Sequence, residues 1–96
     1  MRLYQLYLGT NIPNSNTVVS KSDLLDFLTL FDDLVGYTLL QADGYWYGVS
    51  ETSFILQIAT NRPNIVENVG RRYKLTFSQE SVMLISPDGS VNFMED

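Results

Sequence analysis

The sequence of 96 residues contains no cysteine and no histidine. Without cysteine, the chain has no disulfide, no thiolate nucleophile and no cysteine-ligated metal centre. Without histidine, it lacks the commonest metal ligand and the side chain that ordinarily titrates near neutral pH. These absences exclude many enzyme classes, predict neither a metal nor another cofactor, and favour a binding protein over an enzyme.

Positive charge is also scarce, since six Lys and Arg residues face eleven Asp and Glu residues, for a formal net charge of −5. Affinity for long nucleic acids depends on neutralising phosphates with Lys and Arg, so we expect none here. No apolar run approaches the roughly 20 residues that span a bilayer, and the N-terminal segment lacks the apolar core of a signal peptide. The sequence predicts a cytoplasmic protein, in the host cytoplasm if it is viral, with no membrane partner.

Apolar residues are plentiful, at 45% of the chain against 18% for charged residues, which is the balance of a globular protein. The length is close to the usual size of one domain, so we expect residues 1–96 to form a single domain. A domain this short buries a smaller share of its surface than a larger one does. We therefore expect a homo-oligomer, either a dimer or a larger assembly.

The N-terminal third predicts a strand followed by a helix. Side chains alternate between polar and apolar over residues 2–8, as in a strand with one buried face. The segment Gly9–Thr17 is rich in turn-forming residues and predicts an exposed loop. Ser20 is suited to cap the helix, and Gly36 to end it in a left-handed conformation. The predicted buried stripe consists of Leu24, Phe27, Leu28 and Phe31.

The middle of the chain predicts a long β-hairpin. Residues 37–43 and 52–60 are rich in β-branched, aromatic and aliphatic side chains. Residues 44–48 extend the first of these strands before the chain turns back. The second strand is almost continuously apolar, as expected of a central strand.

A second helix and a final strand complete the predicted fold. The helix begins near Pro63, and Gly70 within it indicates close packing against another element. Residues 81–85 predict a strand, after which residues 91–94 are a candidate for a short return strand. The order of elements predicts an α+β fold of ferredoxin-like βαββαβ type, a four-stranded antiparallel sheet with two helices on one face.

Several short motifs resemble a known family. They are Leu8-Gly9 with Pro13, Gly44-Tyr45-Trp46, Glu51 with Ser53, and the pattern Y-x-x-x-F-x-Q-E-S-V that residues 73–82 form. In this order they resemble the domain-of-unknown-function family 3574, small bacterial and phage proteins, over roughly residues 4 to 85. The resemblance implies a ferredoxin-like fold. The family carries no assigned activity, so no catalytic residue is implied.

Polar side chains near the ends of predicted strands form one candidate ligand site. Glu51, Gln79 and Glu80 lie there, and with Trp46 they would line one pocket if the hairpin and the last strand are neighbours. Two carboxylates in a partly apolar site can divide acid and base work between them. We favour the simpler alternative, in which Gln79 and Glu80 satisfy backbone groups where the second helix joins the last strand.

Three consecutive aromatic residues, Tyr45, Trp46 and Tyr47, form a second candidate. Because side chains alternate between the faces of a strand, at least one side of this cluster is partly exposed. It suits a stacking platform for a base or the centre of a protein interface. Ordinary cross-strand packing is an equal alternative.

Basic residues on or near the second helix form a third candidate. Four of the six in the chain lie there, Arg62, Arg71, Arg72 and Lys74. With the N-terminus of the helix they could hold a phosphate-bearing ligand. We favour a solvated helix face, because most charge clusters are no more than that.

Three functions remain open from the sequence. The first is a non-enzymatic binding module for a small ligand or a protein partner, homo-oligomeric through the sheet face that the helices leave uncovered, where Leu3 and Tyr7 lie. The second is a phage anti-defence protein that sequesters a signalling nucleotide or blocks a host defence protein. The third is a small enzyme with a pocket between sheet and helices, which rests on analogy with other proteins of this fold.

Overall fold

The computed structural model describes residues 1–94. Within this part of the chain, neither helix is long and apolar enough to cross a membrane. Two helices and five strands follow one another in the order β1 (Arg2–Gly9), α1 (Lys21–Leu28), β2 (Thr38–Trp46), β3 (Val49–Thr60), α2 (Pro63–Thr76), β4 (Val82–Ile85) and β5 (Val91–Met94).

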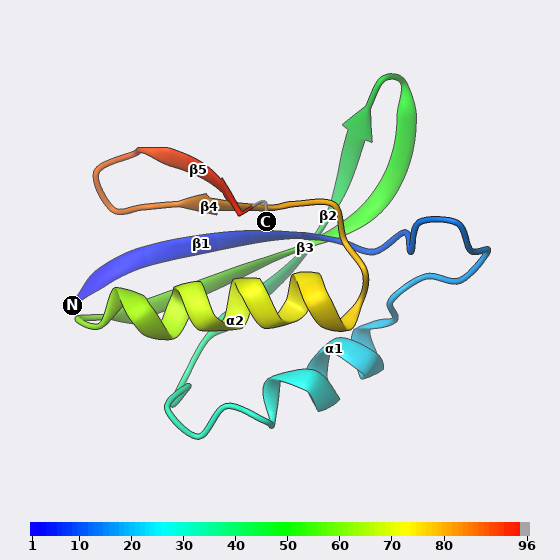
Figure 1. The fold of residues 1–96 in the computed structure, drawn as a ribbon. Helices are drawn as coiled ribbons and strands as arrows, with labels where there is room; N and C mark the ends of the chain where they lie inside the picture. The colour runs from blue at the N-terminus through cyan, green and yellow to red at the C-terminus, as the bar shows by residue number, and fades with distance from the viewer. Residues whose placement is uncertain (95–96) are drawn as a thin grey trace.

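The strands form one antiparallel sheet in the order β2-β3-β1-β4-β5. Both helices lie on the same side of this sheet (Figure 1). The predicted α+β class with two helices is confirmed, and the candidate return strand at residues 91–94 forms as β5, so the sheet has five strands in the described residues and not the predicted four. The turn after β4 closes tightly, because Gly89 has a φ of 86° and the Ser86 amide donates to the Ser90 carbonyl oxygen at 3.0 Å. The chain therefore folds back, and its last described residues pair as a fifth strand.

Helix α1 begins as predicted and ends earlier than predicted. The Ser20 side chain accepts from the Asp23 amide, and the Asp23 side chain accepts from the Ser20 amide, which forms a capping box. The helix ends at Leu28, and the predicted left-handed cap at Gly36 does not form, because Gly36 has no positive φ. The last turn contains no basic residue, so no side chain there offsets the negative end of the helix dipole.

The core lies between the helices and one face of the sheet. Leu6 is paired with Leu56 on one side and Leu84 on the other, and all three are buried. Helix α2 packs against β1 and β4 and contributes Tyr73, which is fully buried. Gly70 confirms the predicted close approach, since an added Cβ would lie 3.1 Å from Leu6 Cδ2. Alternate residues of the strands point to the opposite side, which no helix of the described chain covers (Figure 1).

The predicted long hairpin is confirmed, and its end extends beyond the part of β3 that pairs with β1. Strands β2 and β3 stay paired up to Trp46 and Val49. Tyr47 and Gly48 then make a two-residue turn with φ values of 49° and 78°, the conformation that suits the twist of a hairpin. Figure 1 shows the end of this hairpin bending away from the side that the helices occupy. We call residues 44–51 the arm.

Candidate functional site

A cleft of about 560 Å³ lies at the base of the arm, on the face of the sheet opposite the helices. Residues of the arm form one wall, and the connection from α2 to β4 forms another. Tyr7, Met83 and Phe93, from three neighbouring strands, also line it. The third function considered from the sequence placed a pocket between sheet and helices, whereas this cleft opens on the other side.

Two glycines leave room for the polar groups of the cleft. A Cβ added at Gly9 would lie 2.9 Å from Glu51 Oε1 and 3.1 Å from Gln79 Oε1. A Cβ added at Gly44 would lie 2.7 Å from Ser53 Oγ. The distances to Glu51 Oε1 and Ser53 Oγ are shorter than real Cβ atoms show, and the distance to Gln79 Oε1 is tight. Glycine at these two positions therefore lets the carboxylate, amide and hydroxyl groups approach the sheet.

Glu51 is held by backbone amides of the segment that follows β1. Its Oε2 accepts from the Asn11 amide at 2.9 Å and from the Thr10 amide at 3.2 Å. Thr10 itself is buried, and its hydroxyl donates to the Thr52 carbonyl oxygen at 2.5 Å. Hydrogen bonds from amides to an ionised carboxylate are stronger than those between neutral groups. The arm is thereby fixed to the segment that follows β1, and a negative charge is fixed in the lining of the cleft.

Gln79 and Tyr73 hold the same segment from the side of α2. The Gln79 Nε2 group donates to the Asn11 carbonyl oxygen at 2.9 Å and to the Phe77 carbonyl oxygen at 3.2 Å. The Tyr73 hydroxyl donates to the Gly9 carbonyl oxygen at 2.6 Å. For Gln79 these contacts agree with the favoured prediction that polar side chains at this connection satisfy backbone groups. They also preorganise the wall of the cleft.

Burial, and secondarily the negative charge of Glu51, raises the pKa of Tyr73 far above its ordinary value. We expect Tyr73→Phe to lower the free energy of unfolding by about 1 to 2 kcal/mol at neutral pH, because the buried hydrogen bond to Gly9 is lost. Above about pH 10 the unfolded chain releases the Tyr73 proton and the folded chain retains it, so the wild-type stability falls by up to about 1.4 kcal/mol per pH unit. Urea denaturation between pH 8 and pH 11 should show this fall in the wild type and a shallower one in Tyr73→Phe. Equal slopes in the two proteins would contradict this role of the buried hydroxyl.

Two of the three predicted aromatic residues belong to the cleft. Tyr45 and Trp46 line it and are largely exposed, with 73% of Trp46 open to solvent. Tyr47 is 92% exposed at the tip of the arm, outside the cleft lining, and its ring packs edge-on against Trp46 with 5.1 Å between centroids. Exposed aromatic rings beside a cleft provide stacking area at small entropic cost.

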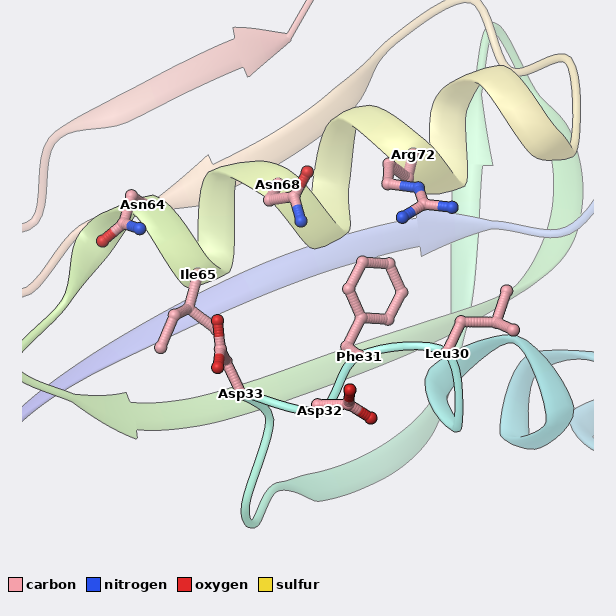
Figure 2. Close-up of a pocket in the computed structure, with 8 residues that line it drawn as sticks. All are labelled: Leu30, Phe31, Asp32, Asp33, Asn64, Ile65, Asn68 and Arg72. Atoms are coloured by element: carbon pink, nitrogen blue, oxygen red, sulfur yellow. The ribbon is translucent and has the colours of Figure 1, made fainter.

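The basic residues of α2 do not join this cleft. Arg72 lies over the Phe31 ring, 5.3 Å from its centroid, in a separate hollow of about 280 Å³. Figure 2 shows this hollow between α2 and the segment that follows α1. At its edge Arg62 approaches Asp33 at 3.9 Å, in an exposed pair that contributes little stability. Arg71 is exposed on α2 and lines neither hollow.

The structure therefore divides the residues predicted from the sequence between two faces of the molecule. Five of them share the cleft: Tyr45, Trp46, Glu51, Gln79 and Glu80. Sequence reasoning did not assign Tyr7, Met83 and Phe93 to it. For four other lining residues a signal was available, because the motifs that carry the family resemblance contain them. These residues are Gly9, Pro13, Gly44 and Ser53.

The chain belongs to the family described as protein of unknown function DUF3574, whose model matches residues 3–93. No protein among the curated sequences matches it. Among solved structures, a phage SAM lyase in its apo state has a similar fold, with a TM-score of 0.75 over 98% of this chain and 88% of the lyase chain. The two sequences are 18% identical, so this likeness establishes the shared fold.

Proposed function

We propose that the cleft binds S-adenosylmethionine or a closely related adenosyl sulfonium compound. One observation carries the proposal: the cleft joins a fixed carboxylate, Glu51, to the exposed ring of Trp46 in a fold that a phage SAM lyase shares. A sulfonium ligand is a cation attached to a nucleoside. It therefore matches a cleft that offers a negative charge and an aromatic surface together.

The arrangement of polar and aromatic groups supports this assignment. Glu51 cannot swing away without releasing two backbone amides, so its charge is preorganised for a cation. By its register Trp46 lies on the same face of the hairpin as Gly44 and Glu51, and its ring offers a surface on which adenine can stack. The basic residues of α2 lie elsewhere, so a positively charged ligand meets no nearby cluster of like charge in the cleft lining.

Cleavage of the bound sulfonium is a second proposed activity, and the lyase fold favours it. The substrate carboxylate forms a bond to its own γ-carbon as the γ-carbon–sulfur bond breaks, and the bond electrons leave with sulfur. The products are a lactone and neutral methylthioadenosine, with no proton to supply and no co-reactant. A chain without histidine and cysteine can promote this step by holding the substrate in a reactive conformation.

Calorimetry with S-adenosylmethionine and S-adenosylhomocysteine tests the binding proposal. The second compound keeps the nucleoside and lacks the methyl group and the positive charge, so it is a matched control. We expect saturable binding of both, with S-adenosylmethionine tighter by about tenfold, which corresponds to about 1.4 kcal/mol. Absence of heat with both compounds would overturn the proposal, and tight binding of a cyclic nucleotide instead would favour the alternative of nucleotide sequestration.

Chromatography of S-adenosylmethionine after incubation with the protein tests the cleavage proposal. We expect methylthioadenosine and homoserine lactone in equal amounts, formed faster than in buffer alone. Binding without product would leave a protein that sequesters the compound. Either outcome is compatible with an anti-defence role in a phage, since both lower the supply of S-adenosylmethionine to host enzymes that use it.

A further inference from the structure

We propose that a second copy of this chain covers the open face of the sheet and, in doing so, closes the cleft. This proposal rests on the proposed function of the cleft described above and names the molecule that completes it. Its main test is the mass of the protein without ligand, which does not depend on what the cleft binds.

A row of apolar residues crosses the whole sheet on the side that the helices leave open. The register pairs each member with the next, from one edge strand to the other. The row consists of Leu40, Ile55, Tyr7, Met83 and Phe93. None of the five is buried, and both end members, Leu40 on β2 and Phe93 on β5, are exposed.

A second row lies two residues along the strands and is also uncharged. It consists of Thr38, Gln57, Gln5, Ile85 and Val91. Within it the Gln57 Nε2 group donates to Gln5 Oε1 at 3.1 Å, which satisfies part of both amides inside the face. The chain has a net charge of −5, yet these ten positions carry no charge. Two copies can therefore approach through this face without the like-charge repulsion that their other surfaces would produce.

The extent of the face suits a stable interface. Five strands spaced about 4.8 Å apart span roughly 19 Å, and the eight residues of β1 extend over roughly 26 Å. With the side-chain relief and the exposed arm added, this approaches the order of the roughly 800 Å² that one partner contributes to a standard interface. A continuous row of apolar side chains on an open face, bordered by polar residues, is typical of an interaction surface.

The row and the cleft are parts of one surface. Three members of the row, Tyr7, Met83 and Phe93, also line the cleft, so a molecule that covers the row reaches the cleft as well. The rings of Trp46 and Tyr47, at the end of the arm, have 73% and 92% of their surface exposed in the single chain. A second copy would bury these rings and exclude water from the bound ligand, which strengthens electrostatic contacts there.

Light scattering coupled to size-exclusion chromatography tests this proposal. At roughly 100 µM, a dimer with a Kd near 1 µM is almost fully associated. We expect the wild-type mass to be a multiple of 10.9 kDa. A monomer at this concentration would overturn the proposal and leave the open face to a different protein partner.

A charge placed in the row should separate the copies. Leu40→Lys introduces a charge at a position that is 43% exposed and does not line the cleft, and Val91→Lys does the same in the second row. We expect both variants to have the monomer mass with unchanged far-ultraviolet circular dichroism, and to bind S-adenosylmethionine about tenfold more weakly. Leu75→Lys, on the exposed side of α2, is the matched control and should keep the wild-type mass. Wild-type mass in both folded row variants would place the interface elsewhere and contradict the proposal.

Discussion

We expect Glu51→Gln to raise the Kd for S-adenosylmethionine by about tenfold or more, and to change that for S-adenosylhomocysteine by about twofold or less. The substitution removes the negative charge and keeps an oxygen that can accept from the amides of Thr10 and Asn11. Two opposite charges about 4 Å apart near a protein surface interact by about 4 kcal/mol. Screening by water in the open cleft reduces this value, so tenfold is the smaller end of the expected range. Calorimetry on both compounds measures the difference.

The comparison between the two ligands separates the loss of the Glu51 charge from structural damage to the cleft. If Glu51→Gln weakened both compounds equally, the carboxylate would act by holding residues 10–11 in place and not by attracting the sulfonium. Thermal unfolding of the same variant shows whether the fold is retained. Equal affinity of wild type and variant for S-adenosylmethionine would remove Glu51 from the binding site.

We expect Trp46→Ala to weaken both compounds by about tenfold or more, because stacking of a base on an aromatic ring contributes about 1 to 3 kcal/mol. This effect should not depend on the charge of the ligand, in contrast to that of Glu51→Gln. In the monomeric background of Leu40→Lys, where Trp46 is 73% exposed, its loss should hardly alter the free energy of unfolding. Calorimetry with both compounds and urea denaturation measure the two quantities.

Tyr47→Ala provides the matched control for Trp46→Ala. Tyr47 is the adjacent aromatic residue, is still more exposed and lies outside the lining of the cleft. In the monomeric background of Leu40→Lys, where no second copy contacts the arm, we expect Tyr47→Ala to leave both affinities unchanged. An equal loss from Tyr47→Ala and Trp46→Ala in that background would indicate a general effect on the arm and contradict stacking on Trp46.

Local patterns in the sequence predicted most of the helices and strands. The errors occur where tertiary contacts determine where an element ends or whether it forms. The capping residues at Ser20 and Asp23 are local, and the start of α1 followed directly from them. Its end did not, because Phe31 is buried by packing although it lies beyond the helix. The helical spacing of apolar residues therefore continued past the point where the helix ends. Residues 91–94 were recognised as a candidate strand but were not counted in the sheet, since β5 is only four residues long and depends on its partner β4.

The sequence predicted some of the residues that line the candidate site and missed others. Glu51, Gln79 and Trp46 were assigned from their places near strand ends and in the hairpin. Tyr7 and Phe93 were not, because they join the cleft through the register across β1, β4 and β5. A single sequence specifies alternation along a strand, but it does not state which strand lies next to which. The basic cluster on α2 was placed on the correct helix, and only the structure shows that this helix covers the opposite face of the sheet.

The fluorescence of Trp46, the one tryptophan of the chain, tests the central claim most directly, because this ring lines the cleft. Titration with S-adenosylmethionine is predicted to change the emission in a saturable manner, with the same Kd as calorimetry gives. Emission that stays constant while calorimetry shows saturable binding would place the ligand away from the cleft and contradict the account.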